Sequence, residues 1–379
     1  MHAVLLDATK AFDRVHFIKM FNELLKKDLC PMICKFLAYQ YAMQKCRVRW
    51  CSKSNYKQFS ATNGVTEGGV LSPILFTIYM DVLLQRLKSS GVGCYIGHVF
   101  AGAFGYADDI ILLAPTRSSM DIMISICEEF SEEFSILFNA TKSRHLFFSK
   151  KNISTKVKFQ MQGATIPTVE NEKHLGNMIG KNGSNKSVKD SVSELYKNTN
   201  LLMSQFSKCN IDVKYKLFKS YCMSVYGSQR WDFSNRICET FYIAWRKCIR
   251  RLLGVPYNTH SNLLPLICND IPVEIQLMCR FINFVRSCSK SQCMIVKICS
   301  KLAVKGSRSA LSNSWSYVCK ILNVDRSNDI QISNLKAQYF NNQTEDNLIT
   351  GALIYDMLSL NHTEHDNELM ELIAELCTC

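Results

Sequence analysis

The first half of the chain interleaves short apolar runs with segments of helical period. Residues 3–7 are an apolar run that ends on an acid, and residues 99–114 are small and apolar on both sides of an Asp-Asp pair. Short apolar runs of this kind are typical of buried strands, so the second segment predicts two strands joined by a tight turn that carries the acids. Further strands are predicted over 144–149 and 157–169, and a hairpin over 46–60.

Apolar residues recur at helical spacing between these strands. Ile18, Phe21, Leu24 and Leu25 predict a helix over 16–27. The same spacing predicts further helices over 32–44, 72–88, 118–134 and 186–206. Beyond about residue 190 the period is helical almost throughout, and the clearest predicted helices are 213–226, 237–253, 272–287 and 291–304.

A polar stretch over 181–186 separates these two patterns. It predicts a mixed α/β part over residues 1–180 and a helical part over 181–340. Residues 341–379 form an acidic tail, in which 351–360 and 368–376 are predicted to be short helices.

The composition is that of a folded chain without a membrane span. Apolar residues make up 47% and charged residues 20% of the 379 positions, which allows a sizeable buried core. No run of about 18 apolar residues is present, and the N-terminus lacks the pattern of a secretory signal. The 18 cysteines form no C-x-x-C pair. Reduced thiols of an intracellular protein are therefore favoured over a zinc site.

The positive charge is concentrated in the body of the chain. The net charge is +13, no Lys or Arg follows Lys336, and residues 341–379 carry eight acids. A basic body favours a polyanionic partner, of which nucleic acid is the commonest, and the alternative is simply a basic surface.

Three acids at strand ends point to a metal site. Carboxylates about 4 Å apart, as expected for Asp108 and Asp109, repel by roughly 4 kcal/mol at an effective dielectric near 20, and a cation would offset that cost. Asp7 presents a third acid at the end of another apolar strand, and three acids on adjacent strand ends could hold two Mg²⁺ ions of the kind that activate phosphoryl transfer. Spacing alone does not join Asp7 to the pair. The alternatives are a solvated hairpin tip for the pair and a helix cap for Asp7.

Ordered motifs surround these acids. Four segments occur in sequence: Leu6-Asp7-Ala8-Thr9-Lys10-Ala11-Phe12-Asp13-Arg14-Val15, Asn63-Gly64-Val65-Thr66-Glu67-Gly68-Gly69-Val70-Leu71-Ser72-Pro73-Ile74-Leu75-Phe76, Tyr106-Ala107-Asp108-Asp109 and Phe138-Asn139-Ala140-Thr141-Lys142-Ser143. They resemble the reverse transcriptases of non-LTR (LINE-type) retrotransposons, and His174-Leu175-Gly176 resembles the turn that follows in that family. The order of all four is far more specific than Tyr-Ala-Asp-Asp alone.

The resemblance implies an α+β fold, a right-handed polymerase with a palm and partial fingers over 1–180, followed by an all-helical thumb and C-terminal region. The implied reaction is RNA-directed DNA synthesis, in which a primer 3′-hydroxyl attacks a dNTP with two Mg²⁺ ions, or Mn²⁺ in their place. The implied partners are an RNA template, a DNA primer and dNTPs, without a membrane.

Individual roles follow from the matched positions. Asp7, Asp108 and Asp109 would be metal ligands, and Lys142 would approach the triphosphate. The implied nucleotide-binding residues are Ala8, Phe12, Glu67, Gly68, Gly69 and Tyr106. Phe12 would exclude a ribose 2′-hydroxyl, although an ordinary core Phe fits the pattern too. A basic helical face, composed of Arg246, Lys247, Arg250 and Arg251, would either track nucleic acid or remain a solvated face.

Two departures from the family pattern keep an alternative open. Glu67 stands where the family usually has Gln, and an ionised carboxylate cannot donate the hydrogen bonds of an amide. The chain begins six residues before Asp7, so the upstream fingers strands are expected to be absent by N-terminal truncation. The alternative to an active enzyme is therefore an inactive remnant that at most binds nucleic acid. A related palm enzyme, such as a maturase, is disfavoured by Leu71-Ser72-Pro73. The family implies a nuclear setting, and cytoplasmic residence stays open.

Overall fold

The computed structural model describes residues 1–47, 58–149, 157–307, 309–322 and 339–360, with the side chains of residues 346 and 356–360 left aside. The chain folds into two compact units, residues 1–175 and 176–379. The mixed α/β pattern predicted for the first half and the helical pattern predicted for the second are both present.

A five-stranded sheet organises the first unit. The strand order is β13-β10-β1-β8-β7. β1 is the central strand and pairs antiparallel with both β8 and β10, whereas β13 adds to β10 in parallel. The bounds are β1 His2–Leu6, β7 Ala103–Tyr106, β8 Asp109–Ala114, β10 Arg144–Phe147 and β13 Thr168–Val169.

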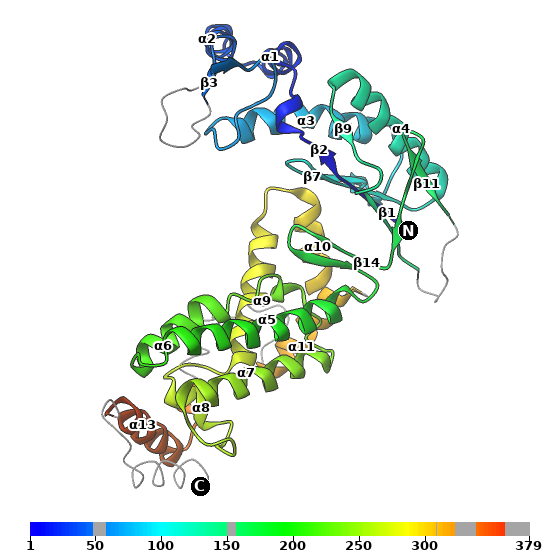
Figure 1. Ribbon diagram of the computed structural model, residues 1–379. Helices are drawn as coiled ribbons and strands as arrows, with labels where there is room; N and C mark the ends of the chain where they lie inside the picture. The colour runs from blue at the N-terminus through cyan, green and yellow to red at the C-terminus, as the bar shows by residue number, and fades with distance from the viewer. Residues whose placement is uncertain (48–57, 150–156, 308, 323–338, 361–379) are drawn as a thin grey trace. The chain divides into compact units, whose positions relative to one another are not determined.

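One face of this sheet is covered by helices. Side chains alternate between the faces of a strand, so Val4, Leu6, Ile110 and Leu112 share a face. They belong to one buried cluster with residues of α3 (Ser72–Ser89) and α4 (Arg117–Phe134), and Figure 1 shows these two helices beside the strands. Odd-numbered positions at the end of β1 therefore fall on the opposite face.

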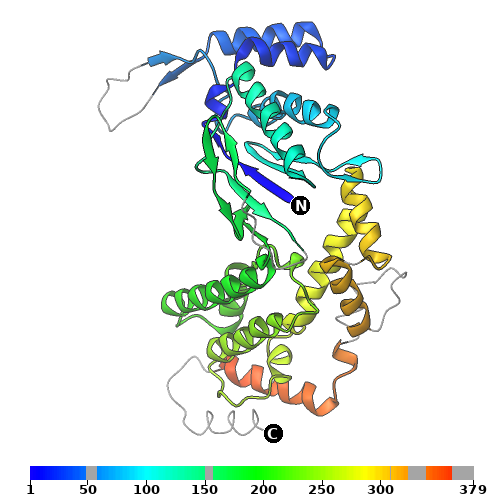
Figure 2. The same ribbon diagram turned by 90° about the vertical axis from the view of Figure 1, so that its right-hand side faces the viewer.

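The remaining elements of the first unit surround this layer. α1 (Phe17–Lys26) and α2 (Pro31–Ala42) lie side by side and are drawn in blue in Figure 2. The hairpin predicted over 46–60 has its two ends paired as strands, and its middle, 48–57, lies outside the described residues. The other elements are β2 Ala8–Thr9, η1 Phe12–Arg14, β3 Lys45–Arg47, β4 Gln58–Ser60, β5 Tyr95–Ile96, β6 Val99–Phe100, β9 Leu137–Phe138, β11 Phe159–Met161, β12 Ala164–Ile166 and β14 Asn171–His174.

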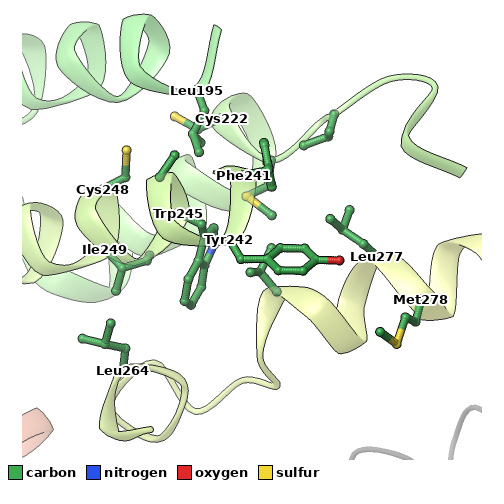
Figure 3. Packing of buried hydrophobic residues seen from close by; sticks show 14 of the residues in the cluster. Leu195, Cys222, Phe241, Tyr242, Trp245, Cys248, Ile249, Leu264, Leu277 and Met278 are labelled. Atoms are coloured by element: carbon green, nitrogen blue, oxygen red, sulfur yellow. The ribbon is translucent and has the colours of Figure 1, made fainter. Parts of the chain in front are cut away.

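The second unit is built almost entirely from helices. Its elements are β15 Asn177–Gly180, α5 Gly183–Gln205, α6 Ile211–Leu217, η2 Phe218–Cys222, η3 Ser228–Arg230, α7 Ile237–Leu253, α8 Leu263–Ile267, α9 Val273–Lys290, α10 Met294–Val304, α11 Ala310–Ile321 and α13 Glu345–Leu360. α5 runs along α7 (Figure 1), and α7 supplies the centre of the apolar core, where Phe241, Trp245 and Ile249 point inward (Figure 3).

Two helix predictions differ in detail from the structure. The helix predicted over 213–226 is α6 followed by a π-helix, η2, in which Met223 N–H donates to the Phe218 carbonyl at 3.1 Å. The helix predicted over 351–360 is the second part of α13, which belongs to the second unit and begins at Glu345. The helix predicted over 368–376 lies outside the described residues. None of the helices that could be examined is both long and apolar enough to cross a membrane.

A buried histidine pair predicts an acid-sensitive sheet. His2 Nδ1 lies 3.0 Å from His145 Nε2, and His145 Nδ1 lies 2.9 Å from Thr168 Oγ1. Burial lowers the pKa of His145 to about 4, and repulsion from His2 contributes. Because the fold favours the neutral ring, its contribution is complete above the unfolded pKa of 6.5 and is lost as the pH falls toward 4. We expect the sheet to lose about 3 kcal/mol over that range.

Hydrogen exchange at β1 and β10, corrected for intrinsic rates, measures this loss at pH values from 7 downward. His145→Phe removes the titrating ring, so its opening free energy should depend much less on pH. His98→Phe, at an exposed position, should behave like the unmodified chain. Equal acid sensitivity of the unmodified chain and His145→Phe would exclude the histidine pair as its cause.

Candidate active site

A two-residue turn presents the Asp-Asp pair. Tyr106 and Asp109 are the last paired residues of β7 and β8, so Ala107 and Asp108 form the turn between them. Ala107 has φ 53°, in the left-handed region that tight hairpin turns require. Both acids are half-buried. The tight turn predicted from the sequence is therefore confirmed.

The strand register brings Asp7 to the same place. Leu6 pairs with Ile110, and one further step along both strands sets Asp7 opposite Asp109. Directly opposed residues in antiparallel strands have Cα atoms about 4.5–5.5 Å apart. By strand alternation, Asp7, Asp109 and Tyr106 lie on the face opposite α3 and α4. We call Asp7, Asp108 and Asp109 the strand-end acids.

The pKa of Asp109 is affected by the other two strand-end acids. Burial is the main reason that the pKa of Asp109 is raised above its ordinary value. The charge of His174 opposes that rise, whereas the negative charges of Asp108 and Asp7 add to it. Asp7, which is distant in the sequence, therefore lies close enough to repel the charge of Asp109, as Asp108 does. A bound cation would offset this repulsion.

The donor set suits a hard divalent ion. Three carboxylates supply the oxygen ligands that Mg²⁺ prefers. The salt bridges of Lys26, Lys27, Arg86, Arg117, Arg144, Lys219 and Arg246 all use other acids. The side chains of the strand-end acids are not gathered tightly enough to count as a metal-holding group, and no other described group of three His, Cys, Asp or Glu residues is either. The chemistry fits, and the side chains would have to converge on an ion.

A loop over 139–143, the Lys142 loop, is fastened directly to Asp7. Asn139 N–H donates to the Asp7 carbonyl at 2.8 Å, and Asp7 N–H donates to Ser143 Oγ at 3.1 Å. Asn139 Oδ1 accepts from the backbone N–H groups of Thr141 and Lys142. Extending the β1–β10 register places Lys142 opposite Asp7, on the side away from Asp109. Its side chain is exposed.

A second loop, over residues 63–69, is fastened to the segment that carries Phe12. Val65 N–H donates to the Phe12 carbonyl and Gly64 N–H to the Val15 carbonyl, each at 2.9 Å. A Cβ on Gly64 would lie 2.9 Å from backbone atoms of Asp13, and its φ is +90°. Only glycine fits that close approach without strain. The structure thus brings together Phe12 and the loop of Glu67, which the sequence had assigned to one nucleotide site.

The aromatic ring of Phe12 is held firmly. It stacks on Phe76 of α3 with a centroid distance of 4.4 Å and an interplanar angle of 10°. Phe76 is fully buried, whereas Phe12 is half-buried. Glu67 and Gly68 are exposed, Gly69 is half-buried, and Gly68 has φ +78° with open space where a Cβ would stand.

The two remaining predicted nucleotide-site residues differ in exposure. Tyr106 precedes the Asp-Asp turn and is 68% exposed. Ala8 is buried in β2, where it pairs with Phe138 of β9 just before the Lys142 loop. Little of the surface of Ala8 is therefore available to a ligand.

The predicted basic face is on α7, and three of its side chains are used within the protein. Arg246 forms salt bridges with Glu239, at 3.1 Å, and with Glu274. Arg250 donates to the Thr259 carbonyl, and Arg251 donates to the side chain of Asn200. Lys247 is exposed. The four residues lie on one helix but are not equivalent.

The sequence assigned no role to three residues that support the strand-end acids. Ser143 accepts from Asp7 N–H, Asn139 organises the Lys142 loop, and the charge of His174 acts on Asp109. An Asn side chain commonly accepts hydrogen bonds from the backbone N–H groups two and three residues later in a turn. The role of Asn139 could therefore have been predicted from the sequence. The effect of His174 on Asp109 is long-range and has no local signal.

Comparison with known proteins bears on the first unit. Residues 1–177 match the family described as reverse transcriptase (RNA-dependent DNA polymerase). The Pol polyprotein of the type-1 retrotransposable element R2 of Nasonia vitripennis is 29% identical over 160 residues, which cover 42% of this chain and 15% of that protein. The Pol polyprotein of the type-2 element R2DM of Drosophila melanogaster is 29% identical over 140 residues, which cover 36% and 13%.

The chain spans only a small part of the curated relatives that it matches. Among solved structures, apo telomerase from Candida tropicalis aligns with a TM-score of 0.37 and 12% identity over 98% of this chain and 53% of that one. A similarity that remote carries no argument about the site.

Proposed function

We propose that residues 1–177 form a reverse transcriptase domain related to those of R2-type non-LTR retrotransposons, and that the chain performs RNA-directed DNA synthesis at the strand-end acids. Its partners would be an RNA template, a DNA primer and dNTPs. The observation that carries the proposal is the β1–β8 register, which sets Asp7 opposite Asp109 at the end of a buried sheet.

The strand-end acids would hold divalent ions. Bound Mg²⁺ would lower the pKa of an attacking 3′-hydroxyl and neutralise charge on the triphosphate and its leaving group. The protein would hold the backbones of three acids close together, at the ends of two strands and in the turn beside them, so that only their side chains move when an ion binds. The raised pKa of Asp109 is consistent with a position that requires a cation.

The Lys142 loop would serve the leaving group. Asn139 and Ser143 fix this loop to Asp7, so the backbone of Lys142 is held beside one of the strand-end acids. A lysine can donate a proton to a phosphate oxygen as the bond to the leaving pyrophosphate breaks. The exposure of Lys142 leaves it free to meet a bound triphosphate.

The Phe12 ring would select deoxyribonucleotides. A rigid ring under the sugar leaves no room for a 2′-hydroxyl, and the Phe76 stack prevents Phe12 from moving aside. Tyr106, on the same face as Asp109, would support the primer end.

Primer extension tests the proposed function. The intact chain is given a homopolymer RNA template, a complementary DNA primer, the matching dNTP and Mg²⁺, and product lengths are measured. We expect a ladder of extended DNA that chelation of Mg²⁺ abolishes. If no extension occurs under any condition while RNA binding persists, the chain is an inactive remnant and the proposal is wrong.

Glu67 predicts a weakened affinity for dNTP. It is exposed on the loop that is fastened to Phe12, so its charge would lie near the triphosphate. One added negative charge at 4 Å costs about 1 kcal/mol in water, which corresponds to roughly a fivefold change. We expect Glu67→Gln to lower the apparent KM for dNTP by about that factor, as measured by primer extension at varied dNTP.

Glu129→Gln is the matched control, because Glu129 is an exposed acid of α4. It should leave the KM for dNTP unchanged. An unchanged KM in Glu67→Gln as well would mean that Glu67 lies away from the triphosphate.

A further inference from the structure

α7 of the second unit has one apolar face and one polar face. Its apolar residues, among them Trp245 and Ile249, point into the core, as Figure 3 shows. On its other side, α7 borders a hollow of about 370 Å³. We call this the α7 hollow, and it is lined by Ile243, Arg246, Lys247, Arg250, Tyr257, Asn258, Thr259, His260 and Ser261.

The wall of the α7 hollow is preformed. The side chain of Arg250 donates to the Thr259 carbonyl at 2.8 and 3.1 Å and to Ser261 Oγ at 3.0 Å. Thr259 closes the loop on itself, because both its N–H and its hydroxyl donate to the Pro256 carbonyl. The loop between α7 and α8 is therefore tied to the helix, and little ordering remains to be done when a ligand binds.

Two of the three Lys and Arg side chains that line the α7 hollow, Lys247 and Arg250, form no salt bridge within the described residues. The partners of Arg250 are a carbonyl and a hydroxyl, both of them neutral. Lys247 is exposed and has no salt bridge within the described part of the chain, whereas Arg246 is paired with Glu239 and Glu274. None of the nine described residues that line the hollow is an acid. Burial lowers the pKa of Arg250 and the nearby Arg246 lowers it further, so an anion here would relieve a real electrostatic cost.

An aromatic ring stands free at the same place. Tyr257 is 80% exposed at the tip of the tied loop, and Ile243, on the α7 side of the hollow, is 44% exposed. An exposed ring beside uncompensated cations is the combination with which proteins bind single-stranded nucleic acid, the ring stacking on a base and the cations holding the phosphate. In a duplex the bases are already stacked on one another, so such a ring would have nothing to bind.

We propose that the α7 hollow binds one nucleotide of a single-stranded nucleic acid, with its phosphate held by Lys247 and Arg250 and its base stacked on Tyr257. Asn258 and His260, which line the same hollow, offer polar groups to the base or sugar. This goes beyond DNA synthesis, because it requires neither a metal ion nor dNTP. It rests on the proposed function only for the choice of nucleic acid as partner.

Fluorescence anisotropy of the intact chain with a labelled oligouridylate tests the proposal in EDTA, without dNTP, over a series of KCl concentrations. Tyr257→Leu should weaken binding about tenfold, and Tyr257→Phe should retain most of it, because the ring is what stacks. Lys247→Gln should reduce the slope of log affinity against log salt by about 0.7, the value for one phosphate contact on a single strand.

Two controls separate the hollow from general effects. Tyr221→Leu removes another tyrosine, 68% exposed on η2, and Lys301→Gln removes an exposed lysine of α10. Both should bind like the unmodified chain. The proposal is overturned if Tyr257→Leu binds the oligouridylate no worse than Tyr221→Leu does, or if Lys247→Gln leaves the salt slope unchanged. It is also overturned if Tyr257→Leu weakens the binding of a duplex as much as that of the single strand. Because this assay contains neither free metal ions nor dNTP, failure of DNA synthesis and failure of the hollow are told apart.

Discussion

Replacing Asp108 by Ala should reduce primer extension by at least about a thousandfold. Asp108 occupies the two-residue turn between β7 and β8, beside Asp109 and near Asp7. Removing one of three carboxylates would weaken the proposed metal binding. Metal stabilisation of transferring phosphate supplies several kcal/mol, of which about 4 correspond to a thousandfold. Rates of single-nucleotide incorporation measure this change.

The controls for Asp108 address both folding and charge. Asp121→Ala removes an exposed acid of α4 that forms a salt bridge with Arg117, four residues earlier on the same helix, so its rate should be unchanged. Circular dichroism should show the same helix content for both variants, because the turn of Asp108 is not part of the core. A rate for Asp108→Ala within a few fold of the unmodified chain would remove the strand-end acids from the mechanism.

Replacing Lys142 by Met should reduce the rate of incorporation by about a hundredfold, at the lower end of what general acid catalysis contributes. Met keeps the length of the side chain and removes both the charge and the proton. The backbone of the Lys142 loop should stay in place, because the bonds that fasten it come from Asn139 and Ser143. The rate is measured at saturating dNTP, so that a loss of affinity does not mask the loss of catalysis.

Lys142→Arg distinguishes charge from proton donation. Arginine retains the positive charge but gives up a proton far less readily. If proton donation matters, Lys142→Arg should stay well below the unmodified chain and should lose its solvent deuterium isotope effect. Full activity of Lys142→Arg would leave Lys142 a purely electrostatic role. Lys158→Met, at an exposed position beside β11, is the matched control.

The sequence predicted the local features of the site well. The apolar runs over residues 3–7 and 99–114 predicted the strands. The turn was predicted because apolar residues flank the Asp-Asp pair on both sides within 99–114. These features depend on neighbours within a few residues, which apolar periodicity and turn chemistry record. The resemblance to a family supplied what periodicity could not, namely that Asp7 and Asp109 belong together.

The sequence alone could not predict which distant residues form salt bridges and hydrogen bonds with the site residues. Glu274, on another helix, forms a salt bridge with Arg246. The guanidinium of Arg250 donates to the backbone carbonyl of Thr259, and a backbone carbonyl is present at every residue, so the sequence does not mark it as a partner. The basic face of α7 therefore could not be sorted into structural and available residues without the structure. The hydrogen bond from Asp7 N–H to Ser143 Oγ joins residues 136 positions apart and was equally invisible.

Iron-directed cleavage tests the central claim most directly, namely that the strand-end acids hold a divalent ion. Fe²⁺ replaces Mg²⁺ in the intact chain, and ascorbate with peroxide then generates radicals that cut the backbone next to the bound ion, without any need for catalysis. We expect cuts near Asp7 and near Asp108 and Asp109, which excess Mg²⁺ suppresses and Asp108→Ala abolishes. Cuts elsewhere in the chain, or the same cuts in Asp108→Ala, would contradict this claim.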